Sequence, residues 1–191
     1  CLVSPDEIRH RPVGAKAEVT ASGWMPAHRP LAVGLTSGAS TPDNLVGAAI
    51  ARRGWVVCNG GYGGTMAAAA RGARRAGGET IGVTCALYGG PPNPYISQHE
   101  EAADLLARLG RLLQLGDGYV VLPGGSGTLL ELALVVEHVH KRLMPPKPVL
   151  LLGRYWRLAL AAARREQDGR RETVREVRTP EAAVHALADA W

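Results

Sequence analysis

Short apolar segments alternate with longer amphipathic ones along most of the chain, starting at residue 30. Leu31–Leu35 is an apolar run that ends in a polar, glycine-containing turn, and Leu45–Gly54 follows with helical spacing and a final glycine. The unit repeats with a strand over Trp55–Asn59, a helix over Thr65–Gly78 and a strand over Thr80–Cys85. Strands that alternate with helices in this way predict an α/β protein with a parallel sheet covered on both faces.

The rest of the chain continues this alternation. Residues 1–29 have no clear period, so we expect an irregular N-terminal arm ahead of a single domain over residues 30–191. Thr179 and Pro180 have the residue types of a helix start. The other expected elements are an irregular loop over 86–97, a helix over 100–115, a strand over 118–123, a helix over 128–142, a strand over 149–153, a helix over 155–166 and a terminal helix over 179–191.

Composition and charge narrow the function classes. Lys and Arg exceed Asp and Glu by 22 to 17, and the basic residues are spread along the chain, which favours a small anionic ligand over nucleic acid. The three cysteines form no paired motif, so neither a disulfide framework nor a metal site is expected. We expect no membrane span and a cytoplasmic protein, the alternative being that Cys1 is the acylated first residue of a lipoprotein.

Three polar, glycine-containing loops follow predicted strands. They lie at residues 36–40, 60–64 and 124–128. In a parallel sheet such loops sit at the carboxyl edge, where glycine allows close backbone approach and helix N-termini attract anions. We therefore predict a phosphate-binding site here, although the loops match neither the dinucleotide fingerprint nor the Walker loop. The candidate binding residues are Ser37, Gly60, Gly61, Gly64, Met66, Gly124, Gly125, Ser126, Gly127 and Thr128.

Glu131 is the one charge in an otherwise apolar stretch from Leu129 to Val136. One interpretation is structural: Thr128 and Glu131 have the spacing of a capping box that satisfies N–H groups at a helix start. The other is catalytic, because a carboxylate at the mouth of a glycine loop lies next to any bound ligand. The two interpretations are compatible.

Arg108 is the basic residue on the apolar face of the preceding predicted helix. A buried guanidinium needs an anion, because an unpaired buried charge is costly. Arg108 either snorkels to solvent or pairs with Asp104 one turn away, or it pairs with a ligand phosphate or with Glu131.

These residues carry a family resemblance. The sequence "PGGSGTLLE" resembles the PGGxGTxxE signature of the LOG (lonely guy) family, often labelled lysine decarboxylase-like, and Arg108 lies where that family has its upstream Arg. The stretch "GGYGGTMAAAARGA" resembles the family's GGxxGxM loop and helix, and "NPY" its pre-helix loop. The likeness covers roughly residues 31–160.

The resemblance implies a Rossmann-like three-layer α/β/α fold and a homodimer that hydrolyses the N-glycosidic bond of a nucleoside 5′-monophosphate, such as a cytokinin riboside monophosphate or AMP. It implies Glu131 as catalytic carboxylate, Arg108 as catalytic or substrate-orienting residue, and a phosphate on the loop ending at Thr128, with no metal or redox cofactor. Family members usually have Lys or Asn after the Arg, whereas this chain has Leu109.

Alternative functions follow from other features. Molybdenum-cofactor carriers share the same sheet and glycine loops, so a non-catalytic nucleotide or cofactor carrier is the second hypothesis. The Arg-rich segment over residues 164–178 would suit nucleic acid or a protein partner, but its mixed charges favour an exposed helix and linker. His138 and His140 point apart on a helix, so we expect them to be solvated rather than a metal pair.

Overall fold

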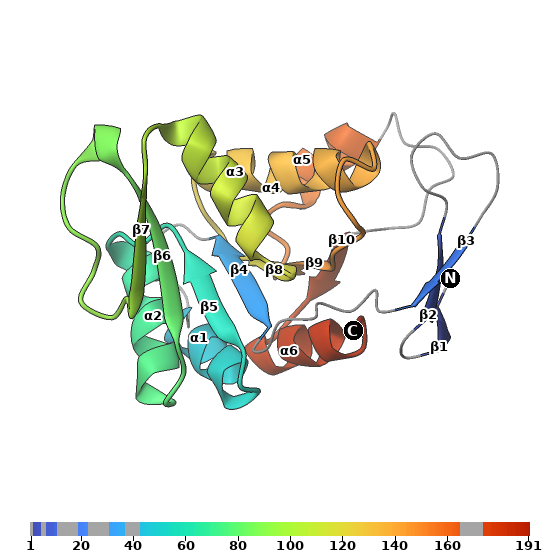
Figure 1. The fold of residues 1–191 in the computed structure, drawn as a ribbon, viewed down its shortest axis with the longest axis horizontal. Helices are drawn as coiled ribbons and strands as arrows, with labels where there is room; N and C mark the ends of the chain where they lie inside the picture. The colour runs from blue at the N-terminus through green and yellow to red at the C-terminus, as the bar shows by residue number, and fades with distance from the viewer. Residues whose placement is uncertain (1, 5–6, 11–18, 23–30, 37–42, 165–173) are drawn as a thin grey trace.

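The computed structural model describes all residues except 1, 5–6, 11–18, 23–30, 37–42 and 165–173. The larger of its two sheets has seven strands in the order β10-β9-β8-β4-β5-β6-β7, all parallel (Figure 1). These strands are β4 (Ala32–Thr36), β5 (Val56–Asn59), β6 (Thr80–Cys85), β7 (Gln98–Ala102), β8 (Gly118–Val121), β9 (Val149–Leu152) and β10 (Val174–Val177).

Helices cover both faces of this sheet, as the alternating sequence pattern predicts (Figure 1). A 3₁₀ turn, η1 (Ala86–Tyr88), follows β6. One face carries α1 (Asp43–Arg52), α2 (Gly64–Arg75) and α6 (Pro180–Ala188), and the other carries α3 (Leu105–Leu115), α4 (Ser126–His140) and α5 (Arg157–Arg164). The expected three-layer α/β/α fold is confirmed. No helix among the described residues is long and apolar enough to cross a membrane.

The order of the strands determines where a ligand can bind. From β4 the chain passes outward through β5, β6 and β7, then returns to place β8 on the other side of β4. The helices that follow β4 and β8, α1 and α4, therefore lie on opposite faces of the sheet, which leaves a crevice at its carboxyl edge. Thr36 at the end of β4 and the residues from Gly125 to Thr128 after β8 border this crevice.

Three segments differ from the sequence-based expectation. The arm over residues 1–29 is not wholly irregular: β1 (Leu2–Ser4), β2 (Glu7–His10) and β3 (Val19–Ser22) form a separate antiparallel sheet, and strands of three or four residues are too short to show a period. The helix expected over 100–115 begins only at Leu105, because residues 98–102 form the edge strand β7. Its charged side chains are typical of an edge strand.

The third difference lies in the Arg-rich segment. We expected an exposed helix and linker there, yet Val174–Val177 forms β10 and pairs with β9. The two valines that end the strand are buried while the charged residues between them are exposed, a pattern too short to stand out in the sequence. The terminal helix is confirmed, since the Thr179 hydroxyl accepts a hydrogen bond from the Ala182 N–H at 3.1 Å.

Helices α1 and α2 cross in direct backbone contact. A Cβ placed on Gly72 would lie 1.9 Å from the carbonyl oxygen of Asn44, and one on Gly47 would lie 2.0 Å from that of Ala69. Glycine at both positions lets the two helices approach more closely than any side chain permits. This contact anchors α2, whose N-terminal loop borders the crevice.

We expect Gly72→Ala to destabilise the protein by about 1–3 kcal/mol, because the added methyl overlaps backbone on a neighbouring helix. Gly110→Ala is the matched control: Gly110 also lies within a helix, and its added Cβ meets no atom within 4 Å. The control should gain up to about 1 kcal/mol from helix propensity. Urea unfolding of both variants measures the difference, and equal effects would contradict the packing argument.

Candidate active site

A cleft opens at the carboxyl edge between β4, β5 and the N-terminus of α4. Its volume is about 450 Å³, within the range of small-ligand sites. Residues from separate parts of the chain line it: Leu35, Thr36, Gly60, Tyr62, Met66, Tyr88, Leu105, Arg108, Leu109, Gly125, Ser126, Gly127, Thr128, Leu130 and Glu131. The cleft thus brings together the two residues that the sequence singled out for catalysis, Arg108 and Glu131.

Glu131 does not form the capping box that its spacing suggested. Helix α4 starts at Ser126 with Gly125 as its N-cap, so Thr128 is already the third helical residue, and no side chain caps the helix. The error has a simple cause: the glycines of the loop continue into the first turn, which begins two residues earlier than expected. Glu131 is therefore one turn further inside α4, and its side chain faces the cleft.

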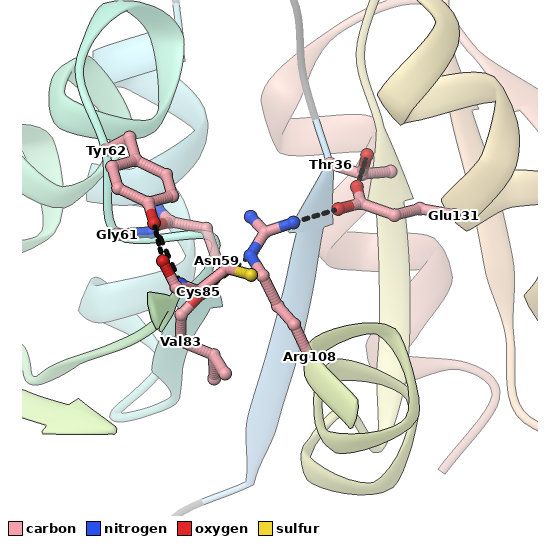
Figure 2. Close-up of polar contacts among 8 residues, drawn as sticks. All are labelled: Thr36, Asn59, Gly61, Tyr62, Val83, Cys85, Arg108 and Glu131. Atoms are coloured by element: carbon pink, nitrogen blue, oxygen red, sulfur yellow. Dashed lines mark hydrogen bonds and ion pairs between the residues drawn. The ribbon is translucent and has the colours of Figure 1, made fainter. Parts of the chain in front are cut away.

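Both carboxylate oxygens of Glu131 have a partner (Figure 2). The Thr36 hydroxyl donates a hydrogen bond to Oε2, and Nη1 of Arg108 lies 3.6 Å from Oε1. The partners come from β4 and α3, on either side of the crevice. They hold the carboxyl group in one orientation.

Arg108 is buried, with only 7% of the residue exposed. Its Nε donates to the carbonyl oxygen of Val83 at 2.8 Å, which leaves the outer nitrogens directed toward the cleft (Figure 2). The predicted pairing with Glu131 is confirmed. The alternative pairing with Asp104 is wrong: that carboxylate accepts the Ala107 N–H and caps α3.

Gly60 makes room for this guanidinium. A Cβ at Gly60 would lie 1.8 Å from Nη2 of Arg108. The Arg108 guanidinium also stands over the Tyr62 ring, 5.8 Å from its centroid, a cation–π arrangement. The loop after β5 therefore positions Arg108 through a missing side chain on one residue and a ring on another.

The loop after β5 is itself fixed by hydrogen bonds. Asn59 accepts the Gly61 N–H at 2.9 Å, and the Asn93 side-chain amide donates to the carbonyls of Gly61 and Tyr62, both at 2.9 Å. Gly61 has a φ of +76°, which favours glycine. The role of Asn59 was not predicted, and Asn93 was noted only as part of the "NPY" motif.

The predicted binding residues divide between the cleft and its surroundings. Gly125, Ser126, Gly127 and Thr128 line the cleft, where the first N–H groups of α4 have no partner within the helix. Gly60 and Met66 also line it. The residues that do not line it are Gly61, Gly64 and Gly124, and Ser37 lies outside the described residues. Thr36 begins the predicted loop 36–40 but was not named as a site residue, and its contact with Glu131 was not predicted.

Burial raises the pKa of Glu131 above its ordinary value of 4.5, and the hydrogen bond from Thr36 and the charge of Arg108 oppose this rise. The carboxyl group is thus less acidic than a surface glutamate. A carboxylate of this kind is a stronger proton acceptor once it is ionised. The site holds a base and a fixed cation within one ion pair.

The histidines near the end of α4 have separate local partners. Nδ1 of His138 lies 2.9 Å from the Leu134 carbonyl oxygen, and Nδ1 of His140 lies 3.8 Å from Glu137. Both residues are half-buried rather than fully solvated as expected. Within the described part of the chain, no three His, Cys, Asp or Glu side chains are grouped as metal ligands would be.

Comparison with known families supports the resemblance seen in the sequence. The family described as "possible lysine decarboxylase" matches residues 66–186, which is more than half of the chain and includes Arg108 and Glu131. The chain belongs to this family, the LOG family.

Curated relatives match the chain locally. The cytokinin riboside 5′-monophosphate phosphoribohydrolase of Mycobacterium tuberculosis is 38% identical over 99 residues, which cover 46% of this chain and 48% of that protein. A 4-hydroxy-3-methylbut-2-enyl diphosphate reductase of Trichodesmium erythraeum is 47% identical over 45 residues, or 24% of this chain and 11% of the reductase. The chain thus spans about half the length, or less, of these relatives.

Two solved structures share the fold over most of the chain. The molybdenum cofactor binding protein of Rippkaea orientalis superposes with a TM-score of 0.72 at 24% identity, covering 86% of this chain and 98% of that one. The molybdenum cofactor carrier protein of Chlamydomonas reinhardtii superposes with a TM-score of 0.68 at 26% identity, covering 84% and 98%.

The raised pKa of Glu131 predicts how stability depends on pH. Between pH 4.5 and the raised value, the folded chain binds more protons at Glu131 than the unfolded chain does, so stability falls as pH rises through this window. Glu131→Gln cannot titrate. We expect the free energy of unfolding of the wild type, minus that of Glu131→Gln, to decrease as pH rises above 4.5 and then to level off.

Urea unfolding at a series of pH values measures this difference. Glu137→Gln is the control, because Glu137 lies on the same helix with a side chain 55% exposed. If this difference instead increased with pH, the pKa of Glu131 would be lowered by Arg108 and Thr36 more than it is raised by burial, which would contradict the prediction.

Proposed function

We propose that this LOG family member hydrolyses the N-glycosidic bond of a nucleoside 5′-monophosphate, releasing the base and ribose 5-phosphate. The observation that carries the proposal is the position of Glu131, which is held by Thr36 and Arg108 in a cleft whose neighbouring wall is the N-terminus of α4. A purely structural carboxylate would have no need of this orientation beside a ligand-sized cleft.

The phosphate would bind at the start of α4. The N–H groups of Ser126, Gly127 and Thr128 face no earlier turn of the helix, and the positive end of the helix dipole adds to their attraction for an anion. Glu131 lies one turn further along the same helix. A ribose attached to that phosphate is then placed over the carboxylate.

The chemistry follows from the charge that develops during bond cleavage. As the C1′–N bond breaks, its electron pair moves to the base and the ribose ring becomes positively charged. The Glu131 carboxylate stabilises this charge more than it stabilises the neutral substrate. Water forms the new C1′–O bond; its proton passes to Glu131 and then to the departing base, so the reaction balances with water as the one co-reactant.

Arg108 would serve this reaction in two ways. Its ion pair holds Oε1 of Glu131 in place, and the outer guanidinium nitrogens reach substrate oxygens in the cleft. The hydrogen bond to Val83 restricts the side chain to one orientation. Arg108 is therefore the orienting residue and Glu131 the reacting one.

A second candidate function is a non-catalytic nucleotide or cofactor carrier. The observation in its favour is the structural likeness to a molybdenum cofactor binding protein and to a molybdenum cofactor carrier protein. A carrier would bind a phosphorylated ligand at the same α4 loop and leave it intact. Recovery of the intact ligand after incubation distinguishes this function from hydrolysis.

We also propose a homodimer formed through the outer face of α4. Leu129 and Leu130 are 42% and 43% exposed, and Leu134 and Val136 behind them are half-buried. A second copy of the chain would cover this apolar face.

Light scattering at micromolar concentration should give the mass of a dimer. Leu129→Glu should shift the mass toward a monomer, because it places a charge in the proposed interface outside the cleft. Leu158→Glu, on α5 at a residue 87% exposed, is the control and should leave the mass unchanged. A monomeric wild type contradicts the proposal.

The activity test uses a panel of purine and pyrimidine nucleoside 5′-monophosphates, with free base detected by mass spectrometry. We expect Glu131→Gln to reduce the rate of base release by about 100-fold or more, because the carboxylate is needed in the transition state. Glu137→Gln, on the same helix but exposed, should retain the wild-type rate. Equal rates for the two variants, or intact nucleotide with every substrate, would exclude the proposed reaction.

A further inference from the structure

The end of the cleft opposite the α4 loop has a different chemistry. Figure 2 shows Arg108 between Glu131 on one side and Tyr62 on the other. Around Arg108 the lining side chains are mostly aromatic or apolar, and they come from the loop after β5, from α2, from η1 and from α3: Tyr62, Met66, Tyr88, Leu105 and Leu109. If a phosphate binds at α4 and the ribose lies over Glu131, this end receives the base, so the inference rests on the proposed function.

Tyr62 can offer only its ring. Its hydroxyl donates to the Cys85 carbonyl oxygen at 3.1 Å and accepts the Cys85 N–H at 2.8 Å, so it is fully engaged by the backbone (Figure 2). The ring is therefore fixed in the wall of the cleft.

Tyr88 stands beside it and is open to solvent. Its ring centroid is 6.1 Å from that of Tyr62, with the planes at 47°, and 55% of the residue is exposed. It ends the η1 turn and is followed by two glycines with positive φ, Gly89 at 65° and Gly90 at 85°. An exposed aromatic ring at the edge of a cleft, next to a fixed one, provides a surface for a planar group.

Few polar side chains in the cleft are available to recognise a base by hydrogen bonds. Thr36, Arg108 and Glu131 contact one another or the backbone, and Ser126 and Thr128 belong to the opposite end. No amide, imidazole or second carboxylate is among the described lining residues. Leu109 stands where family members usually carry a polar residue. Discrimination between bases requires directed donors and acceptors, whereas stacking accepts any aromatic ring.

We propose that Tyr88 is a specificity-determining residue that stacks on the base of the substrate, with Tyr62 as the fixed wall behind it. The site then selects nucleoside 5′-monophosphates by the area of the aromatic ring. Purines bind better than pyrimidines, and adenine, guanine and hypoxanthine are treated alike.

The test compares the binding of a ligand that has a base with the binding of one that lacks it. Calorimetry measures the Kd of AMP and of ribose 5-phosphate for three proteins in a Glu131→Gln background, which prevents turnover: the parent, Tyr88→Ala and Tyr88→Phe. Tyr88→Ala should weaken AMP binding on the order of tenfold and leave ribose 5-phosphate unchanged. Tyr88→Phe keeps the ring and should retain the parental Kd for AMP within about twofold.

Several outcomes overturn the proposal. Equal weakening of AMP and ribose 5-phosphate means that Tyr88 acts through the fold, and an unchanged Kd for AMP means that it does not meet the base. AMP that binds no more tightly than ribose 5-phosphate in the parent excludes base binding altogether. A preference for AMP over GMP or IMP of more than about 100-fold indicates hydrogen-bond recognition instead.

The proposed reaction and the proposed stacking site can be contradicted separately. If the wild type releases no base but the Kd of AMP still depends on the ring at residue 88, the hydrolase function is wrong and the stacking site stands. If the wild type releases base and Tyr88→Ala has the same kcat/KM for AMP, the reaction stands and the stacking site is wrong.

Discussion

The ion pair between Arg108 and Glu131 joins α3 and α4, the helices that precede and follow β8 in the chain and cover the same face of the sheet. Each partner is buried enough to depend on the other, because a lone charge at either position would lose its hydration without compensation. The pair thus requires α3 and α4 to pack at one fixed separation over β4, which both helices contact and which supplies Thr36. The geometry of the proposed catalytic pair therefore depends on the packing of this face of the sheet.

Glycines around this pair are as important as the residues that have side chains, because they leave space for close contacts. Gly60 leaves the space that the guanidinium occupies, and Gly47 and Gly72 allow the close crossing of the helices that support the loop after β5. Asn93, more than thirty residues after Gly60, completes the loop by binding its carbonyl groups. The cleft is therefore built by backbone approach as much as by side-chain contacts.

The sequence predicted the layers of the fold because alternating apolar and amphipathic segments recur from β4 to β9, each long enough to show its period. It did not predict β7 and β10, since edge strands with charged residues lack the continuous apolar run of a buried strand. Arg108 and Glu131 were found because each is a charge in an apolar setting. Thr36 and Asn59 were not, because ordinary polar residues acquire their roles only from strand register and loop shape.

The start of α4 has a consequence for folding itself. Helix α4, whose N-cap is Gly125, has no capping side chain and so lacks the few tenths of a kcal/mol, roughly, that serine or aspartate would add over glycine there. An anion bound at this position, as proposed for the substrate phosphate, would supply the missing hydrogen-bond acceptors, so its binding and the order of the first helical turn would be thermodynamically linked. On this proposal the first turn of α4 is less stable in the empty protein than in the protein with its ligand.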